Sequence, residues 1–146
     1  LVTHTGREAA RDSAQLADEG MVRVVFHPVS FIGAESKTAA NAFGCAIDED
    51  KGEEFIPAVY AEQRAENSGV FTEDKLIAIG DSVGASGDAF DSCVQDDSYA
   101  VWVDDVAARA NDTGITQTPT VQLDGETLTD LSPEGIEKAI NDAAAQ

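Results

Sequence analysis

Apolar positions from about Ser36 to Thr113 recur at the three- and four-residue spacing of amphipathic helices. Good cap residues stand before two of these segments, Thr72 before one and Ser86 before another. The pattern predicts a block of short helices without a strand. The apolar stripes are Ala39, Phe43, Ala46 and Ile47; Phe55, Ile56, Val59 and Tyr60; Leu76, Ile77 and Ile79; Phe90, Cys93 and Val94; and Tyr99, Trp102, Val103, Val106 and Ala110.

Strand signals lie on either side of this block. Val22–Phe26 is short, β-branched and apolar on both faces, which is typical of a buried strand, and Pro28 prevents its continuation. Residues 118–123 alternate and meet Asp124-Gly125, a strong hairpin signal, with a returning strand expected over residues 126–128. We therefore expect three strands, two of them in one hairpin.

Helices are expected at both ends of the chain. Residues 5–19 are helix formers that end at Gly20, a residue typical of a C-cap. Ser132 and Pro133 match the N-cap and the first position of a last helix. The order of helix, strand, helical block, hairpin and helix predicts one α/β domain with a thin sheet. We expect the native protein to have residues before Leu1 that complete it.

The charge of the chain argues against anionic partners. Nine Lys and Arg stand against 28 Asp and Glu, a formal net charge of -19, which repels nucleic acid and anionic membranes alike. Solubility of an exported protein explains this acidity more simply than a specific cationic partner does. No apolar run approaches the roughly 18 residues of a spanning helix, so direct membrane insertion by this chain is not expected.

The two cysteines, Cys45 and Cys93, are too far apart in sequence to form a redox dithiol motif. Only His4 and His27 could join them as soft ligands, so a zinc site is improbable. Two readings stay open, a pair of buried free thiols or one structural disulfide, and we favour the disulfide. Closing a loop of that length would stabilise the fold by about 4 kcal/mol on entropic grounds.

Residues 114–120, Gly-Ile-Thr-Gln-Thr-Pro-Thr, followed by a hairpin and a terminal helix, resemble the matching segment of the DsbA-type thioredoxin-like proteins of bacteria. Gln117 stands where many relatives have Gly. Four further stretches resemble the family in the same order, namely residues 22–28, 43–46, 71–76 and 90–94.

The resemblance implies a thioredoxin-like fold formed by residues 1–33 and 114–146, with an inserted helical subdomain over 34–113. It implies a cis peptide before Pro119 that presents the backbone of Thr118 to an extended client. The chain departs from the family in lacking the first strand and the Cys-x-x-Cys segment. No catalytic residue is therefore assigned in this chain.

The implied activity is thiol-disulfide exchange with the cysteines of exported client polypeptides, outside the cytoplasm and without a metal or cofactor. A redox-inactive thioredoxin-fold module that binds peptides or proteins is the alternative. A third possibility is a cytosolic relative that acts on small molecules. For His27 we favour a satisfied or exposed side chain over a role in tuning a redox centre, and we expect Trp102 to be a core residue and not part of a client groove.

Overall fold

The computed structural model describes residues 16–145 of the chain. These residues fall into two compact units. One is drawn from residues 1–26 and 115–146, and the other comprises residues 27–114. The assignment of residues 34–113 to an inserted subdomain stays a prediction.

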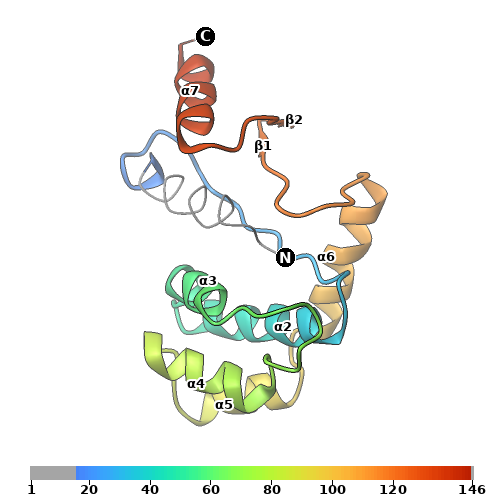
Figure 1. Ribbon diagram of the computed structural model, residues 1–146. Coiled ribbons are helices and arrows are strands. Elements are labelled where there is room, and N and C mark those ends of the chain that lie inside the picture. Colours follow the sequence, from blue (N-terminus) through green and yellow to red (C-terminus); the bar gives the residue numbers. More distant parts are fainter. Residues whose placement is uncertain (1–15, 146) are drawn as a thin grey trace. The chain divides into compact units, whose positions relative to one another are not determined.

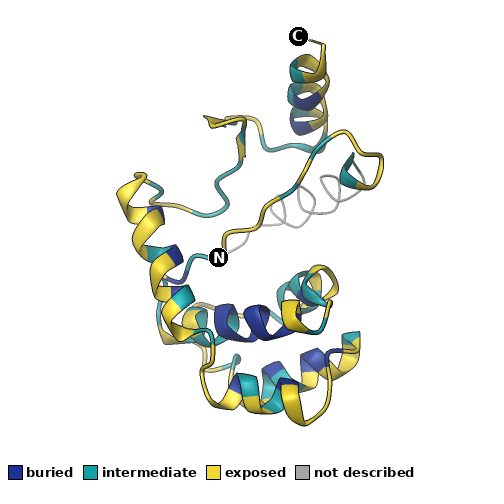
Figure 2. Cartoon of the chain, turned by 180° about the vertical axis from the view of Figure 1, so that it is seen from behind, coloured by how far each residue is buried: buried dark blue, intermediate teal, exposed yellow. Residues whose placement is uncertain are grey.

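The second unit is helical, as the apolar stripes predicted (Figure 1). α2 packs against four other helices of the unit, and Figure 2 shows its buried positions as a continuous dark stretch. Apolar burial of this kind is the main term that holds short helices together. The helices are α2 (Ala34–Asp48), α3 (Gly52–Ala61), α4 (Glu73–Val83), α5 (Asp88–Gln95) and α6 (Ala100–Asp112).

The core of the helical unit is built from the predicted stripes. Phe55, Leu76 and Phe90 are almost wholly buried, and the rings of Phe55 and Phe90 meet edge to face with centroids 6.2 Å apart. Trp102 packs at the margin of this core against the rings of Phe43 and Tyr99, which confirms its structural role.

One predicted cap of the helical unit is confirmed and one is wrong. The side chain of Thr72 accepts a hydrogen bond from the backbone of Lys75 and so caps α4. Ser86 does not cap α5, because the cap position falls one residue later, at Gly87. The φ angle of Gly87 is 103°, a conformation that favours glycine.

The hairpin of the first unit is confirmed at the predicted turn. β1 (Gln122–Leu123) pairs antiparallel with β2 (Glu126–Thr127), and Asp124 and Gly125 both have positive φ, 49° and 90°, as a tight hairpin turn requires. The strands are shorter than predicted, although Leu128 still donates its backbone N–H to the Val121 carbonyl at 2.9 Å.

The predicted strand Val22–Phe26 is wrong. The segment carries no strand assignment, and Val25 and Phe26 are 56% and 40% exposed. The physical reason is that a strand exists only as a member of a hydrogen-bonded ladder, and none of the described segments pairs with this one. Its apolar composition therefore does not suffice to make it a strand.

The last helix, α7 (Pro133–Ala144), begins as predicted, with Ser132 accepting from the Gly135 backbone at 3.1 Å and Pro133 in the first turn. Ile136 and Ile140 are its buried positions, and the residues packed against them come from the same unit: Leu16, Val22, Leu123 and Leu128. Of the predicted first helix, residues 16–19 are described; residues 16–18 are helical, residue 19 is in a turn, and Gly20 follows with φ 75°. The remainder of that prediction lies outside the described residues.

Candidate functional site

The segment between α6 and β1 holds the predicted client-binding residues. Residues 115–121 form no helix or strand, and the peptide bond between Thr118 and Pro119 is cis. The hydroxyl of Thr120 donates to the carbonyl of Gln117 at 2.8 Å and closes a tight turn around these two residues. The side chains of Thr118, Pro119 and Thr120 are half-buried.

The backbone of Thr118, at the centre of this turn, has no hydrogen-bond partner within residues 16–145. Among the described residues, neither its N–H nor its C=O takes part in a hydrogen bond. The neighbouring positions are engaged, because Gln117 accepts from Thr120 and Val121 accepts from Leu128. The loop is thus fixed on both sides and leaves one backbone donor and one acceptor for a partner in extended conformation.

The turn before α7 is organised by Asp130. Its carboxylate accepts from the hydroxyl of Ser132 at 2.7 Å and from the backbone of Ser132 at 3.0 Å, and these bonds hold the pKa of Asp130 below its usual value. A Cβ on Gly135 would lie 2.4 Å from the Asp130 side chain, so only glycine fits there without a shift. This arrangement fixes the start of the helix that supports the hairpin.

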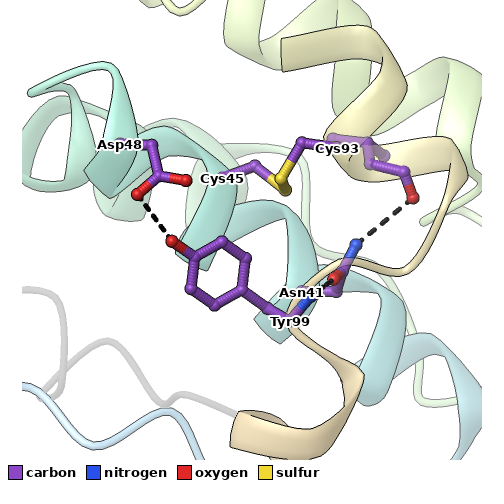
Figure 3. Close-up of a disulfide and its surroundings, with 6 residues drawn as sticks. Asn41, Cys45, Asp48, Cys93 and Tyr99 are labelled. Carbon is purple, nitrogen blue, oxygen red and sulfur yellow. Dashed lines mark hydrogen bonds between the residues drawn. A yellow bond between two sulfur atoms is a disulfide. The ribbon is translucent and has the colours of Figure 1, made fainter. Parts of the chain in front are cut away.

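Cys45 and Cys93 form a disulfide that joins α2 to α5 (Figure 3), with their Cα atoms 5.9 Å apart. The predicted pairing is confirmed. Cys45 is 1% exposed, whereas Cys93 is partly exposed. The chain contains two cysteines, and both are bonded to each other here, so neither is a free thiol in this structure.

Sequence reasoning missed the polar residues around this disulfide. Asn41 is 1% exposed, and its side-chain amide donates to the Val94 carbonyl at 3.2 Å and accepts from the Tyr99 backbone at 2.8 Å. The Tyr99 hydroxyl donates to Asp48 at 2.5 Å, which raises the pKa of that tyrosine. The one signal in the sequence was an asparagine four residues before Cys45.

The other candidates bring no further site together. His27 is exposed, and His4 lies outside the described residues. Within residues 16–145 no cluster of three or more histidine, cysteine or acidic side chains has the arrangement of a metal site. None of the helices in that range combines the length and apolarity needed to span a bilayer.

The chain was compared with protein families and with solved structures. A family profile described as Thioredoxin matches residues 7–142. A solved structure from Mycobacterium tuberculosis, described as the reduced form of the disulfide bond oxidoreductase DsbG, superposes with a TM-score of 0.81 at 23% sequence identity. The alignment covers 96% of this chain and 70% of that one. No curated protein matches the chain. The predicted thioredoxin-like fold with a large helical part is confirmed.

Proposed function

The chain belongs to the thioredoxin family, and from that premise we propose that it is the client-binding part of a thiol-disulfide oxidoreductase acting on cysteines of exported proteins. The fold it shares with the mycobacterial DsbG structure supports this proposal. The disulfide between Cys45 and Cys93 supports placement outside the cytoplasm, because such bonds persist in oxidising compartments.

The observation that carries the proposal is the backbone of Thr118, whose N–H and C=O have no partner in the part of the chain that the structure describes. The loop around it is held by the Thr120 bond and by the hairpin that follows. An extended client segment would pair with this N–H and C=O as one strand pairs with another. Recognition through backbone atoms suits an enzyme with many clients, because it reads no particular side chain.

In thiol-disulfide exchange a thiolate attacks one sulfur of a disulfide, and the other sulfur leaves as a thiolate. The role of this chain would be to hold the client cysteine in place while that transfer takes place. The attacking thiol would have to be one other than Cys45 and Cys93, which are joined to each other within the helical unit.

The same pairing favours a second candidate, a thioredoxin-fold module that binds extended polypeptides and performs no redox chemistry. Such a module needs the loop at Thr118 and no free cysteine. The two candidates share the binding step and differ only in the exchange step.

The binding step is tested with an extended peptide in which serine replaces cysteine, so that no disulfide can form. Thr118→Ala keeps the backbone N–H and should bind within twofold of the unchanged chain. Thr118→Pro removes that N–H and should weaken binding about tenfold, the effect of losing one hydrogen bond. Isothermal calorimetry measures both. Equal affinity of the two variants for the peptide would mean that the Thr118 N–H takes no part in binding.

The exchange step is tested on the native polypeptide that contains these 146 residues, by its ability to catalyse reduction or oxidation of a disulfide in a model client. Turnover supports the oxidoreductase. Binding of the serine peptide without turnover supports the redox-inactive module instead.

A further inference from the structure

Asn41 and Cys45 lie one turn apart on α2 (Figure 3). Both bind the segment that runs from the end of α5 to the start of α6, and we call this part of the helical unit the corner. Cys45 is bonded to Cys93 near the end of α5. Asn41 reaches the next residue, Val94, through its amide N–H and the backbone of Tyr99 through its amide oxygen. One buried side chain thus bridges both ends of the connection from α5 to α6.

These bonds are made by groups other than the two sulfur atoms. Val94 is fully buried in the core, so its carbonyl is fixed by packing as well as by Asn41. The hydroxyl of Tyr99 adds a third attachment to α2 through Asp48. With the sulfur-sulfur bond reduced, the same contacts would keep Cys93 opposite Cys45.

We propose that this corner is a preorganised disulfide-forming site in which Asn41 is the positioning residue, Cys93 is the entry thiol and Cys45 closes the bond. The order follows from exposure, because Cys45 is 1% exposed and only Cys93 is open in part to an external reagent. The proposal concerns how this chain acquires its own disulfide, and it is independent of the client-binding function.

The reaction takes two exchange steps with a small disulfide such as oxidised glutathione. The thiolate of Cys93 attacks one glutathione sulfur, forming a mixed disulfide and releasing the first glutathione thiolate. Cys45 then loses its proton and attacks the sulfur of Cys93, which breaks the mixed disulfide and releases the second. Two electrons pass from the cysteines to glutathione, and the two thiol protons go to solvent or to the released thiolates.

The positioning role is tested by equilibrating the chain with mixtures of reduced and oxidised glutathione, which gives the effective concentration of one thiol toward the other. Asn41→Leu keeps the same branching of heavy atoms and removes both hydrogen bonds, so the effective concentration should fall about tenfold or more. Ser82→Ala is the matched control. The Ser82 hydroxyl donates to the Ile79 carbonyl within α4 and forms no hydrogen bond with Asn41 or the two cysteines. In the Ser82→Ala chain the effective concentration of one thiol toward the other should therefore stay within twofold of the unchanged chain.

An Asn41→Leu chain that keeps its helical circular dichroism when reduced, with an effective concentration within twofold of the unchanged chain, overturns the proposal. If that variant unfolds on reduction, Asn41→Asp takes its place, since it keeps an oxygen that accepts from Tyr99 and puts a second oxygen where the donor to Val94 stood. A fall in effective concentration for Asn41→Asp supports the role, and an unchanged value overturns it.

The order of attack is tested on the two single-thiol variants. Cys45→Ser leaves Cys93 and should react with Ellman's reagent at least tenfold faster than Cys93→Ser, which leaves the buried thiol of Cys45. Equal rates, or the reverse order, would overturn the assignment of Cys93 as the entry thiol.

Discussion

At the start of α4, one hydroxyl satisfies a backbone donor that the helix cannot. The first N–H groups of any helix lack partners within it, and the Thr72 side chain accepts from the third of them, that of Lys75, at 3.2 Å. At the start of α5 no side chain does this, because Gly87 occupies the cap position. The two helix starts therefore differ in what a single substitution can remove.

Thr72→Ala should lower the free energy of unfolding of the helical unit by about 1 kcal/mol, the usual effect of losing a cap. Ser86→Ala is the matched control and should change it by less than about 0.5 kcal/mol, because that hydroxyl caps nothing. Urea unfolding followed by circular dichroism measures both. Equal losses would mean that Ser86 contributes a contact absent from this structure.

Both tyrosines should titrate above their usual pKa of about 10. The pKa of Tyr99 is raised chiefly by its hydrogen bond to Asp48, and that of Tyr60 by burial. A raised pKa in the fold means that each neutral hydroxyl stabilises the chain fully below pH 10, and that this stability is lost as the pH rises through the folded value. Asp48→Asn should return the pKa of Tyr99 toward 10 and leave Tyr60 unchanged, as read by ultraviolet absorbance titration. A shift of both groups would place the cause elsewhere.

Residue by residue, the sequence predicted features that depend on local chemistry. Asp124-Gly125 forms the hairpin turn because the two residues tolerate positive φ, and Ser132 caps α7 because its hydroxyl reaches the third residue along. The bonds of Asn41 were beyond prediction, since its partners lie 53 and 58 residues away. Such pairs arise only when the helices have packed.

At the scale of elements, α4 and α5 can pack closely because Gly80 of α4 has no side chain. A Cβ at Gly80 would lie 2.2 Å from the ring of Phe90 and 2.8 Å from the carbonyl of Ala85. Gly80 is therefore required by packing between helices, although glycine is a poor helix former. The ring of Phe90 fills the space that a larger residue would occupy.

Gly80→Ala should lower the free energy of unfolding by about 1–3 kcal/mol, because the clash with Phe90 outweighs the gain of about 1 kcal/mol in helix propensity. Ala78→Gly, at an exposed position of the same helix, measures propensity alone and should cost about 1 kcal/mol. Thermal or urea unfolding compares them. A Gly80→Ala chain more stable than the unchanged one would contradict the close packing of α4 on α5.

Helices, whose backbone hydrogen bonds lie within the element, were predicted better than strands, which need a neighbouring strand for theirs. Each helix of the central block makes its own hydrogen bonds, so an apolar stripe sufficed to locate it. The segment from Val22 to Phe26 has strand composition, yet a strand also needs a neighbouring ladder, which composition does not reveal. The loop at Thr118 was located by its resemblance to a family, and not by any periodicity.

At the scale of the whole molecule, negative charge far exceeds positive charge, with a net value of -19. All four lysines of the chain lie in ion pairs: Lys37 with Asp104, Lys51 with Glu54, Lys75 with Glu62 and Lys138 with Asp142. These pairs are at the surface and contribute about 0–1 kcal/mol each. Because 28 Asp and Glu outnumber nine Lys and Arg, the negative charge is not balanced by positive charge, and self-repulsion opposes the folded state.

Added salt should therefore stabilise the chain. Raising NaCl from about 0.01 M to about 0.2 M shortens the Debye length, and so the repulsion between carboxylates weakens. The four surface ion pairs also weaken, but the stability lost with them should be smaller than the stability gained from the reduced repulsion. The urea midpoint at neutral pH should rise over this range. At pH 4, where much of the negative charge is neutralised, the same change in salt should have less effect. A midpoint that falls with salt at neutral pH would mean that the ion pairs dominate.

The central claim is that the backbone of Thr118 pairs with an extended client, and amide hydrogen exchange of that one residue tests it most directly. Without a client the Thr118 N–H should exchange rapidly, since no described residue accepts from it. With saturating serine-substituted peptide it should become protected, while exposed amides elsewhere, such as that of Thr129, should not change. Protection confined to the helical unit, or unchanged exchange at Thr118 in the bound state, would contradict the account.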